Sequence, residues 1–293
     1  MSAQIIDGKL IAQKVRDEVA AEVAERIKAG KPQPVLATVL VGDRVDSATY
    51  VSAKGKACQE LGMGSANHPL PSDISQEDLE KLIRQLNADP TVNGILVQLP
   101  LPSHLDEEKV LQLISIEKDV DGFSPLNIGR LAQKGREPLF VPCTPDGSIY
   151  LLEQAGVKIE GANAVVLGRS NIVGMPAALL LISKNATVTV CHSRTKDLPN
   201  VIRQADILIA AIGRAEMVKG DWIKPGAAII DVGINSKPDA TKKKGYRLVG
   251  DVEYDSCAEV AGFITPVPGG VGPMTIAMLM KNTLKAAKIQ QDK

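Results

Sequence analysis

Residues 164–176 read AVVLGRSNIVGMP, and this stretch decides the class of fold that the chain can adopt. A short aliphatic run ends at Gly168, which is typical of a strand buried in a parallel sheet. Gly174 follows six residues later, at the expected start of a helix. The usual dinucleotide fingerprint has a further glycine at position 170, where this chain has Ser170. Because glycine turns between a strand and a helix are common in α/β proteins, a plain structural turn remains an equal alternative.

The surrounding sequence repeats this strand-and-helix rhythm. Helix-forming or polar segments separate four aliphatic runs, which is the pattern of a doubly wound nucleotide-binding domain. We therefore expect a Rossmann-type domain over residues 146–272. The four runs are AVVLG (164–168), ATVTVC (186–191), DILIAAIG (206–213) and AAIIDVG (227–233).

The first half of the chain shows the same alternation. Strands are predicted at VLATVLVG (35–42) and GILVQLPLP (94–102), and helices over the first thirty residues up to Gly30, around Tyr50 and Lys54, from Ser75 to Asn87, and over 106–115. We expect a second α/β domain over residues 1–145, to which a C-terminal helix over 273–293 returns. Between the domains, Thr144 is expected to cap a helix with Pro145 at its first position.

Composition limits the kinds of partner. The chain of 293 residues has 34 basic and 34 acidic side chains, so no charged field is available to hold nucleic acid or an anionic membrane. Four widely spaced cysteines and three histidines form no zinc-binding pattern and indicate a reducing compartment. Residues 1–30 lack the apolar core of a signal peptide. We expect a cytoplasmic protein that binds small molecules, without a metal.

The end of the second strand in the nucleotide domain indicates which dinucleotide binds. It reads CHSRT (191–195), where an NAD enzyme usually has an acidic residue that binds the ribose hydroxyls. Ser193, together with Arg194 or Arg169, offers donors suited to a 2′-phosphate. We therefore predict NADP rather than NAD. His192 has no apparent carboxylate or cysteine partner and is more simply structural.

Two segments that contain lysines have a simple structural explanation as well as a functional one. Tyr50 and Lys54 lie one turn apart on one helix face, although lysines on helices are usually solvated. The segment KPDATKKKG (237–245) is expected to be an exposed arm followed by a strand at 246–252. An anion site at Lys242 to Lys244 is less favoured than simple solvation.

Taken together, the motifs resemble those of the bifunctional methylenetetrahydrofolate dehydrogenase/methenyltetrahydrofolate cyclohydrolase family. The resemblance covers essentially the whole chain and implies two domains with a folate-binding cleft between them. It also implies a homodimer formed through the cofactor domains, to which the arm contributes. The motifs, in the family's order, are SATYVSAKGKA (47–57), GILVQLPLP (94–102), EKDVDGF (117–123), VVLGRSNIVGMP (165–176) and ITPVPGGVGPMT (264–275).

The resemblance implies roles for residues around the folate. It implies that Lys54 is the main catalytic group of the cyclohydrolase and that Tyr50 lies against the folate rings. Gln98 resembles the glutamine that orients this lysine, and Asp121 the aspartate that pairs with the pterin's amino-pyrimidine edge. The backbone is expected to approach the folate at Pro268, Gly269, Gly270 and Gly272, and the cofactor contacts implied are Gly168, Arg169, Ser170, Ser193 and Ile234.

The implied activity is oxidation of 5,10-methylenetetrahydrofolate with NADP, followed by hydrolysis to 10-formyltetrahydrofolate. This places the chain in one-carbon metabolism, which supplies purine, methionine and histidine biosynthesis. Water attacks a cationic amidinium carbon in the hydrolysis, so a lysine can act as the base only where its ammonium form is disfavoured. Two alternatives share the layout: an amino-acid or shikimate-type dehydrogenase with a lysine base, and a non-catalytic NADP-sensing module.

Overall fold

The computed structural model describes residues 2–242 and 245–291 and divides the chain into two compact units. One unit consists of Met1–Gln13 and Pro142–Thr275, and we call it the six-stranded unit after its sheet. The other consists of Lys14–Val141 and Ile276–Lys293, and we call it the three-stranded unit. The division falls inside two long helices, α1 (Gly8–Lys28) and α10 (Val271–Gln291).

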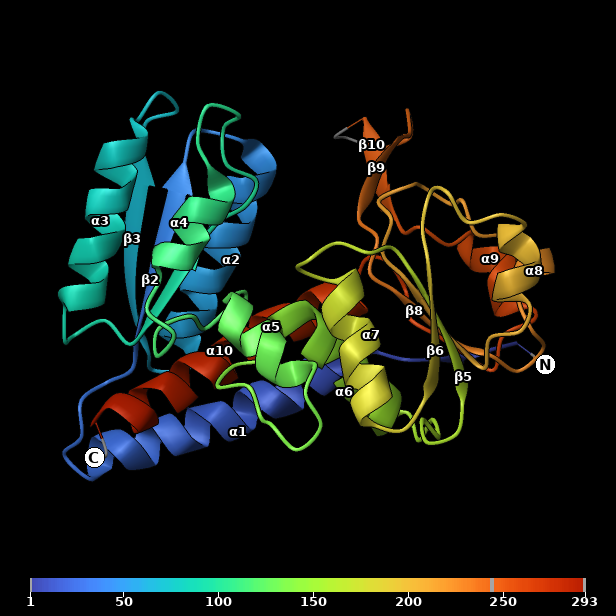
Figure 1. Cartoon of the computed structure of the whole chain (residues 1–293), viewed down its shortest axis with the longest axis horizontal. Coiled ribbons are helices and arrows are strands. Elements are labelled where there is room, and N and C mark those ends of the chain that lie inside the picture. The colour runs from blue at the N-terminus through green and yellow to red at the C-terminus, as the bar shows by residue number, and fades with distance from the viewer. Residues whose placement is uncertain (1, 243–244, 292–293) are drawn as a thin grey trace. The chain divides into compact units, whose positions relative to one another are not determined.

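The six-stranded unit is built on a fully parallel sheet with the strand order β1-β11-β8-β7-β5-β6. Figure 1 shows α6 and α7 on one side of this sheet and α8 and α9 on the other. Its strands are β1 (Gln4–Ile5), β5 (Asn163–Leu167), β6 (Thr187–Cys191), β7 (Ile207–Ala210), β8 (Ala228–Asp231) and β11 (Phe263–Ile264). Its other helices are α6 (Cys143–Gln154), α7 (Gly174–Ser183), α8 (Leu198–Ile202), η1 (Gly220–Trp222) and α9 (Tyr254–Ala258).

Aliphatic side chains of the central strands form the core of this unit. Val165 and Leu167 of β5 pack with Ile202 of α8 and Cys257 of α9, and each of these four side chains is at most 1 % exposed. Four of the strands, β5 to β8, coincide with the four aliphatic runs of the sequence. The prediction of a Rossmann-type parallel sheet is therefore confirmed.

The three-stranded unit has a parallel sheet in the order β3-β2-β4, in which β2 is central. Its inner face packs on α3 and α4 through Val39, Ile83 and Val110, all 0 % exposed, while α2 lies on the opposite face (Figure 1). The strands are β2 (Val35–Val41), β3 (Gly64–Leu70) and β4 (Gly94–Val97), and the helices are α2 (Val45–Glu60), α3 (Gln76–Ala88), α4 (Glu107–Leu113) and α5 (Pro125–Leu131).

The C-terminal half of α10 completes the three-stranded unit. The Asn282 side chain donates hydrogen bonds to the backbone oxygens of Val120 and Val141, at 2.9 and 3.2 Å. Arg26 of α1 donates to the Gln291 side chain at 2.6 Å. These contacts tie residues near the end of the chain to segments more than a hundred residues away.

Several boundaries differ from those expected. Helix α6 begins at Cys143, so Thr144 does not cap it and Pro145 is not its first residue; instead the Thr144 hydroxyl lies 3.0 Å from that of Thr275. Helix α10 begins at Val271, two residues before Pro273. The first thirteen residues group with the six-stranded unit rather than with residues 14–141, because β1 pairs with β11.

The arm after β8 is an antiparallel hairpin of β9 (Asn235–Pro238) and β10 (Tyr246–Val249). Of the proposed Lys242 to Lys244 cluster, Lys243 and Lys244 lie outside the described residues. All four cysteines are free and buried. Within the described ranges, the helices are all too short or too polar to cross a membrane.

Candidate active site and cofactor pocket

Lys54 is buried in the three-stranded unit, at 8 % exposure. Its ammonium nitrogen donates a hydrogen bond of 3.0 Å to the Gln98 side-chain oxygen. The Gln98 amide nitrogen donates at 2.9 Å to the Leu99 carbonyl, which fixes the amide so that its oxygen faces Lys54. Because Gln98 directly follows β4, this pair lies at the carboxyl end of a parallel strand, where α/β proteins place their ligands.

Neighbouring positions on α2 distinguish Lys54 from an ordinary helix lysine. The side chain of Lys56 is 77 % exposed and lies 3.6 Å from Glu60, so it is a solvated surface charge. Tyr50, one turn before Lys54, is 37 % exposed. The side chain of Lys56 is therefore solvated, whereas that of Lys54 is not.

The loop that carries Asp121 is held by the buried carboxylate of Asp119. Asp119 accepts hydrogen bonds from the backbone N–H groups of Phe123 and Ser124 and from the Asn127 side chain, at 3.1, 2.8 and 2.9 Å. Burial raises the pKa of Asp119 to about 6, and these hydrogen bonds oppose the rise. Asp121 is half-buried on the turn thus formed. Asp119 therefore has a structural role, which is to hold the turn that carries Asp121.

The turn between β5 and α7 requires glycine at two positions. Gly168 has φ of +123°, and a Cβ there would lie 2.1 Å from the Ala211 oxygen. A Cβ at Gly174 would lie 2.3 Å from the Gly168 oxygen. The Ser170 hydroxyl accepts from the N–H groups of Val173 and Gly174, at 3.2 and 3.3 Å. Its own proton is left to donate, so serine at 170 caps the turn and still offers a donor to an anion.

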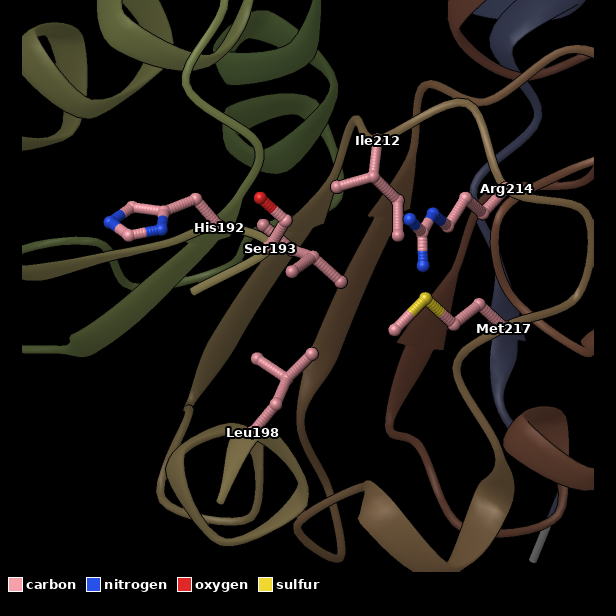
Figure 2. Close-up of a pocket in the computed structure, with 7 residues that line it drawn as sticks. His192, Ser193, Leu198, Ile212, Arg214 and Met217 are labelled. Carbon is pink, nitrogen blue, oxygen red and sulfur yellow. The ribbon is translucent and has the colours of Figure 1, made fainter. Parts of the chain in front are cut away.

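A pocket of about 190 Å³ opens beyond the carboxyl ends of β5, β6 and β7. Ser193 and Arg214 contribute polar groups to it, but Arg169 and Arg194 are not among its lining residues. Figure 2 shows the Arg214 side chain extending toward Ile212 and Met217, while the His192 ring points away from the other labelled side chains. The lining consists of Leu167, His192, Ser193, Leu198, Ile212, Arg214 and Met217.

Two buried carboxylates organise the loops beside this pocket. Asp251, 0 % exposed, accepts from the backbone N–H groups of Ile212, Gly213 and Arg214 at 2.7, 3.0 and 2.8 Å. Asp231 accepts from the N–H groups of Asp251 and Val252, both at 2.9 Å. Burial, with a smaller contribution from the charge of Asp251, raises the pKa of Asp231 to about 7. The sequence analysis missed both aspartates and Arg214; the one available signal was that Asp231 ends an aliphatic strand and that Asp251 and Arg214 each follow a glycine.

Two of the residues predicted to contact a ligand lie close together, one just after β8 and one in the 268–272 loop. Ile234 is 47 % exposed, unusual for a large apolar side chain, and a Cβ on Gly272 would lie 4.0 Å from its Cδ1 atom. Gly269 has φ of +115°, and a Cβ on Gly270 would lie 2.7 Å from the Pro266 oxygen. The chain itself therefore requires these two glycines. Pro268 is exposed after a cis peptide bond.

Such a fold and such a turn define a class: an α/β protein with a dinucleotide-binding domain. The model of the tetrahydrofolate dehydrogenase/cyclohydrolase NAD(P)-binding domain matches residues 142–291, and the model of the catalytic domain of the same family matches residues 6–121. The chain belongs to the tetrahydrofolate dehydrogenase/cyclohydrolase family. The family resemblance expected from the sequence is confirmed.

Individual relatives agree along nearly the whole length. The chain is 60 % identical over 287 residues to bifunctional protein FolD 2 of Arabidopsis thaliana, covering 98 % of this chain and 96 % of the relative. It is 57 % identical over 288 residues to bifunctional protein FolD of Moorella thermoacetica, covering 98 % and 100 %. The solved Trypanosoma brucei methylenetetrahydrofolate dehydrogenase-cyclohydrolase, complexed with NADP and an inhibitor, has a TM-score of 0.95 and 44 % identity, covering 99 % of this chain and 98 % of that one.

Proposed function

We propose that this chain oxidises 5,10-methylenetetrahydrofolate with NADP and then hydrolyses the methenyl product to 10-formyltetrahydrofolate. The observation that carries the proposal is the buried Lys54, held at 3.0 Å by Gln98 in a member of this family. A shikimate-type dehydrogenase and an NADP sensor, the two alternatives, are not supported by full-length relatives that are bifunctional.

In the hydrolysis, Lys54 acts as the general base. Water adds to the bridging carbon of the cationic amidinium, and its proton passes to the amine nitrogen of Lys54. Gln98 accepts a hydrogen bond from that nitrogen, so it orients the lysine without adding a negative charge that would favour the ammonium. The bond between the bridging carbon and N5 then breaks as the formyl C=O bond forms. Lys54 gives its proton to N5, and the remaining hydroxyl proton is released to solvent, so that the hydrolysis of the cation yields one proton overall.

The remaining residues of the three-stranded unit bind the folate. Tyr50 offers a partly exposed ring one turn from Lys54, which suits stacking against the pterin. Asp121 offers a carboxylate that accepts hydrogen bonds from the amino-pyrimidine edge, on a turn that Asp119 holds in place. In the six-stranded unit, Pro268, Gly269 and Gly272 are assigned to the folate.

NADP fits the residues of the six-stranded unit. When bound, NADP accepts the hydride from the methylene bridge, and the protein's part is to position it. Gly168, Arg169 and Ser170 are assigned to the pyrophosphate at the start of α7, Ser193 to the ribose phosphate, and the exposed Ile234 to the nicotinamide half. The relative solved with bound NADP supports this choice.

We also place the protein, as a homodimer, in one-carbon metabolism that feeds purine, methionine and histidine biosynthesis. Its four free, buried cysteines support a reducing compartment such as the cytoplasm. Exposed apolar side chains on the β9–β10 hairpin support a dimer contact there. The equal numbers of basic and acidic groups give no support to binding nucleic acid.

Two assays on the purified chain test the activity. With methylenetetrahydrofolate and NADP, we expect NADPH to appear; with methenyltetrahydrofolate alone, we expect the amidinium absorbance to disappear faster than in buffer. NADPH formation with shikimate or an amino acid but not with the folate would overturn the proposal. NADP binding without turnover of either folate would identify a sensor instead.

A further inference from the structure

We propose that Asp251 is a positioning residue for hydride transfer. Its carboxylate joins the loop 212–214 to the loop 233–235 and so fixes Ile234, the side chain assigned to the nicotinamide half. The inference rests on the proposed dehydrogenase reaction and adds to it a residue that is 0 % exposed and acts through its neighbours.

The two loops follow neighbouring strands of the six-stranded sheet. Strands β7 and β8 are paired and parallel. The loop 212–214 follows β7 and the loop 233–235 follows β8, so both leave the carboxyl edge of the sheet, where a dinucleotide binds. Ile212 and Arg214 of the first loop line the pocket beyond β5, β6 and β7, and Ile234 belongs to the second loop.

One oxygen atom of Asp251 contacts both loops. Its Oδ1 atom accepts hydrogen bonds from the backbone N–H of Arg214 at 2.8 Å and from the Asn235 side-chain amide at 2.9 Å. Its Oδ2 atom accepts from the N–H groups of Ile212 and Gly213, at 2.7 and 3.0 Å. Four N–H donors thus converge on one buried carboxylate, and hydrogen bonds to an ionised acceptor are stronger than those to a neutral one.

Ile234 is anchored on both sides. The N–H of Gly233, the residue before it, donates to Asp231 at 2.9 Å, and the side chain of Asn235, the residue after it, donates to Asp251. A Cβ on Gly233 would lie 2.4 Å from the Asp251 carboxyl carbon, so this backbone packs directly on the carboxylate. The Ile234 side chain is nevertheless 47 % exposed. A fixed backbone that presents an exposed apolar side chain limits how far a nicotinamide ring in contact with it can shift.

A carboxylate is needed at position 251 because all four donors require an acceptor. An ionised aspartate has two acceptor oxygens, whereas an asparagine amide has one oxygen and one nitrogen that donates. In Asp251→Asn, two of the four N–H groups would therefore face another donor. One of the two loops would lose its anchor, although the volume of the side chain is unchanged.

Steady-state kinetics of both reactions test this assignment. For Asp251→Asn we expect kcat for NADPH formation to fall about ten-fold or more, because a displaced nicotinamide no longer meets the methylene bridge in the reactive geometry. Hydrolysis of methenyltetrahydrofolate without NADP should change little, because Lys54 and Gln98 belong to the other unit. The ratio of the two rates therefore reports positioning, whereas a loss of folded protein lowers both rates together.

Two further variants isolate the contact between positions 235 and 251. Asn235→Ala removes the anchor of the second loop alone and should also lower kcat for NADPH formation. It tests the same contact even where Asp251→Asn does not fold. Combining Asp251→Asn with Asn235→Asp exchanges the two side chains, so that the amide at 251 donates to the carboxylate at 235 while its oxygen still faces the loop 212–214. We expect this exchange to recover most of the kcat that Asp251→Asn loses.

The control is Glu259→Gln, which neutralises an exposed carboxylate of the same unit and should change neither rate. Equal losses of NADPH formation and hydrolysis in Asp251→Asn would indicate general damage and overturn the positioning role. An exchange variant no more active than Asp251→Asn, or normal NADPH formation in both single variants, would overturn it as well. A wild-type protein that forms no NADPH would instead refute the proposed dehydrogenase reaction.

Discussion

At the scale of single residues, two lysines on α2 have opposite environments. Lys54 is 8 % exposed, and its nitrogen lies 3.0 Å from the Gln98 oxygen, while the side chain of Lys56 is 77 % exposed. They are two positions apart, so they point to different faces of the helix. Burial takes Lys54 out of water, and the hydrogen bond to the Gln98 amide orients its nitrogen. Position on the helix face thus separates a candidate base from a solvated charge.

We expect Lys54→Met to abolish hydrolysis of methenyltetrahydrofolate while NADP binding and the folded state persist. Methionine keeps most of the aliphatic volume in the buried site but has no basic nitrogen. The measurement is the rate of loss of methenyl absorbance, with NADP affinity from calorimetry as the folding check. Lys56→Met serves as the matched control and should hydrolyse at the wild-type rate. Hydrolysis by Lys54→Met at more than the rate in buffer would remove Lys54 from the mechanism.

At the scale of elements, the strand-to-helix turn depends on close backbone contacts. A methyl group at Gly174 would overlap the backbone oxygen of Gly168, and a methyl group at Gly168 would overlap that of Ala211 after β7. The N-terminus of α7 is thereby placed next to the ends of β5 and β7, where its dipole favours an anion. The packing of the turn therefore requires glycine at both positions by itself.

Gly168→Ala should destabilise the six-stranded unit by about 2 kcal/mol or more and weaken NADP binding, because the turn must shift to relieve the contact with Ala211. Urea unfolding and calorimetry measure the two effects. Gly161→Ala is the comparison: Gly161 also has positive φ, but a Cβ there meets nothing within 4 Å. If the two variants lose equal stability, backbone strain alone, and not the close contact, explains the glycine.

The loop 119–124 carries a second element-scale prediction, in its dependence on pH. Burial raises the pKa of Asp119 from an ordinary 3.8 to about 6, so the folded state binds its proton more tightly than the unfolded state. Its contribution to stability is therefore fully present below about pH 4 and is lost as pH rises through about 6, a change of about 3 kcal/mol at about 1.4 kcal/mol per pKa unit.

We expect carboxyl carbon chemical shifts to give a pKa near 6 for Asp119. The unfolding free energy of wild type, relative to Asp119→Asn, should fall between pH 4 and pH 6, since the amide does not titrate. A measured pKa below 4 would show that the hydrogen bonds from Phe123, Ser124 and Asn127 outweigh burial.

At the scale of the whole molecule, the β9–β10 hairpin is the candidate dimer contact. Tyr246 and Leu248 lie on one face of β10 and are both 38 % exposed. Large apolar side chains on a projecting hairpin are a usual mark of a protein–protein contact.

Replacing both Tyr246 and Leu248 by serine should shift the protein from dimer to monomer in analytical ultracentrifugation, because the contact loses its apolar area. Leu10→Ser, at an exposed leucine of α1, should leave the dimer intact. A wild-type protein that sediments as a monomer, or a double variant that remains a dimer, would place no interface on this hairpin.

Local pattern in the sequence determined much of this molecule. The aliphatic runs predicted β5 to β8, because strands of a parallel sheet covered by helices are rich in aliphatic and β-branched residues. Ser75 predicted the start of α3, since its hydroxyl accepts the Asp78 N–H at 3.1 Å. The folate-site residues, by contrast, came from the family resemblance and not from periodicity or spacing. The segment GSANHPL gave no signal for β3, which forms by pairing along the whole length of β2.

Only the tertiary structure decided the rest. Lys54 is hydrogen-bonded to Gln98, which is 44 residues away, and the backbone of Arg214 is held by Asp251, which is 37 residues away. Strand β1 joins the six-stranded sheet through β11, at the other end of the chain. Strand preference and helix capping arise between residues a few positions apart, so they are legible in the sequence. Strand order, burial and the charges that surround a side chain arise from contacts between distant segments, and only folding brings those segments together.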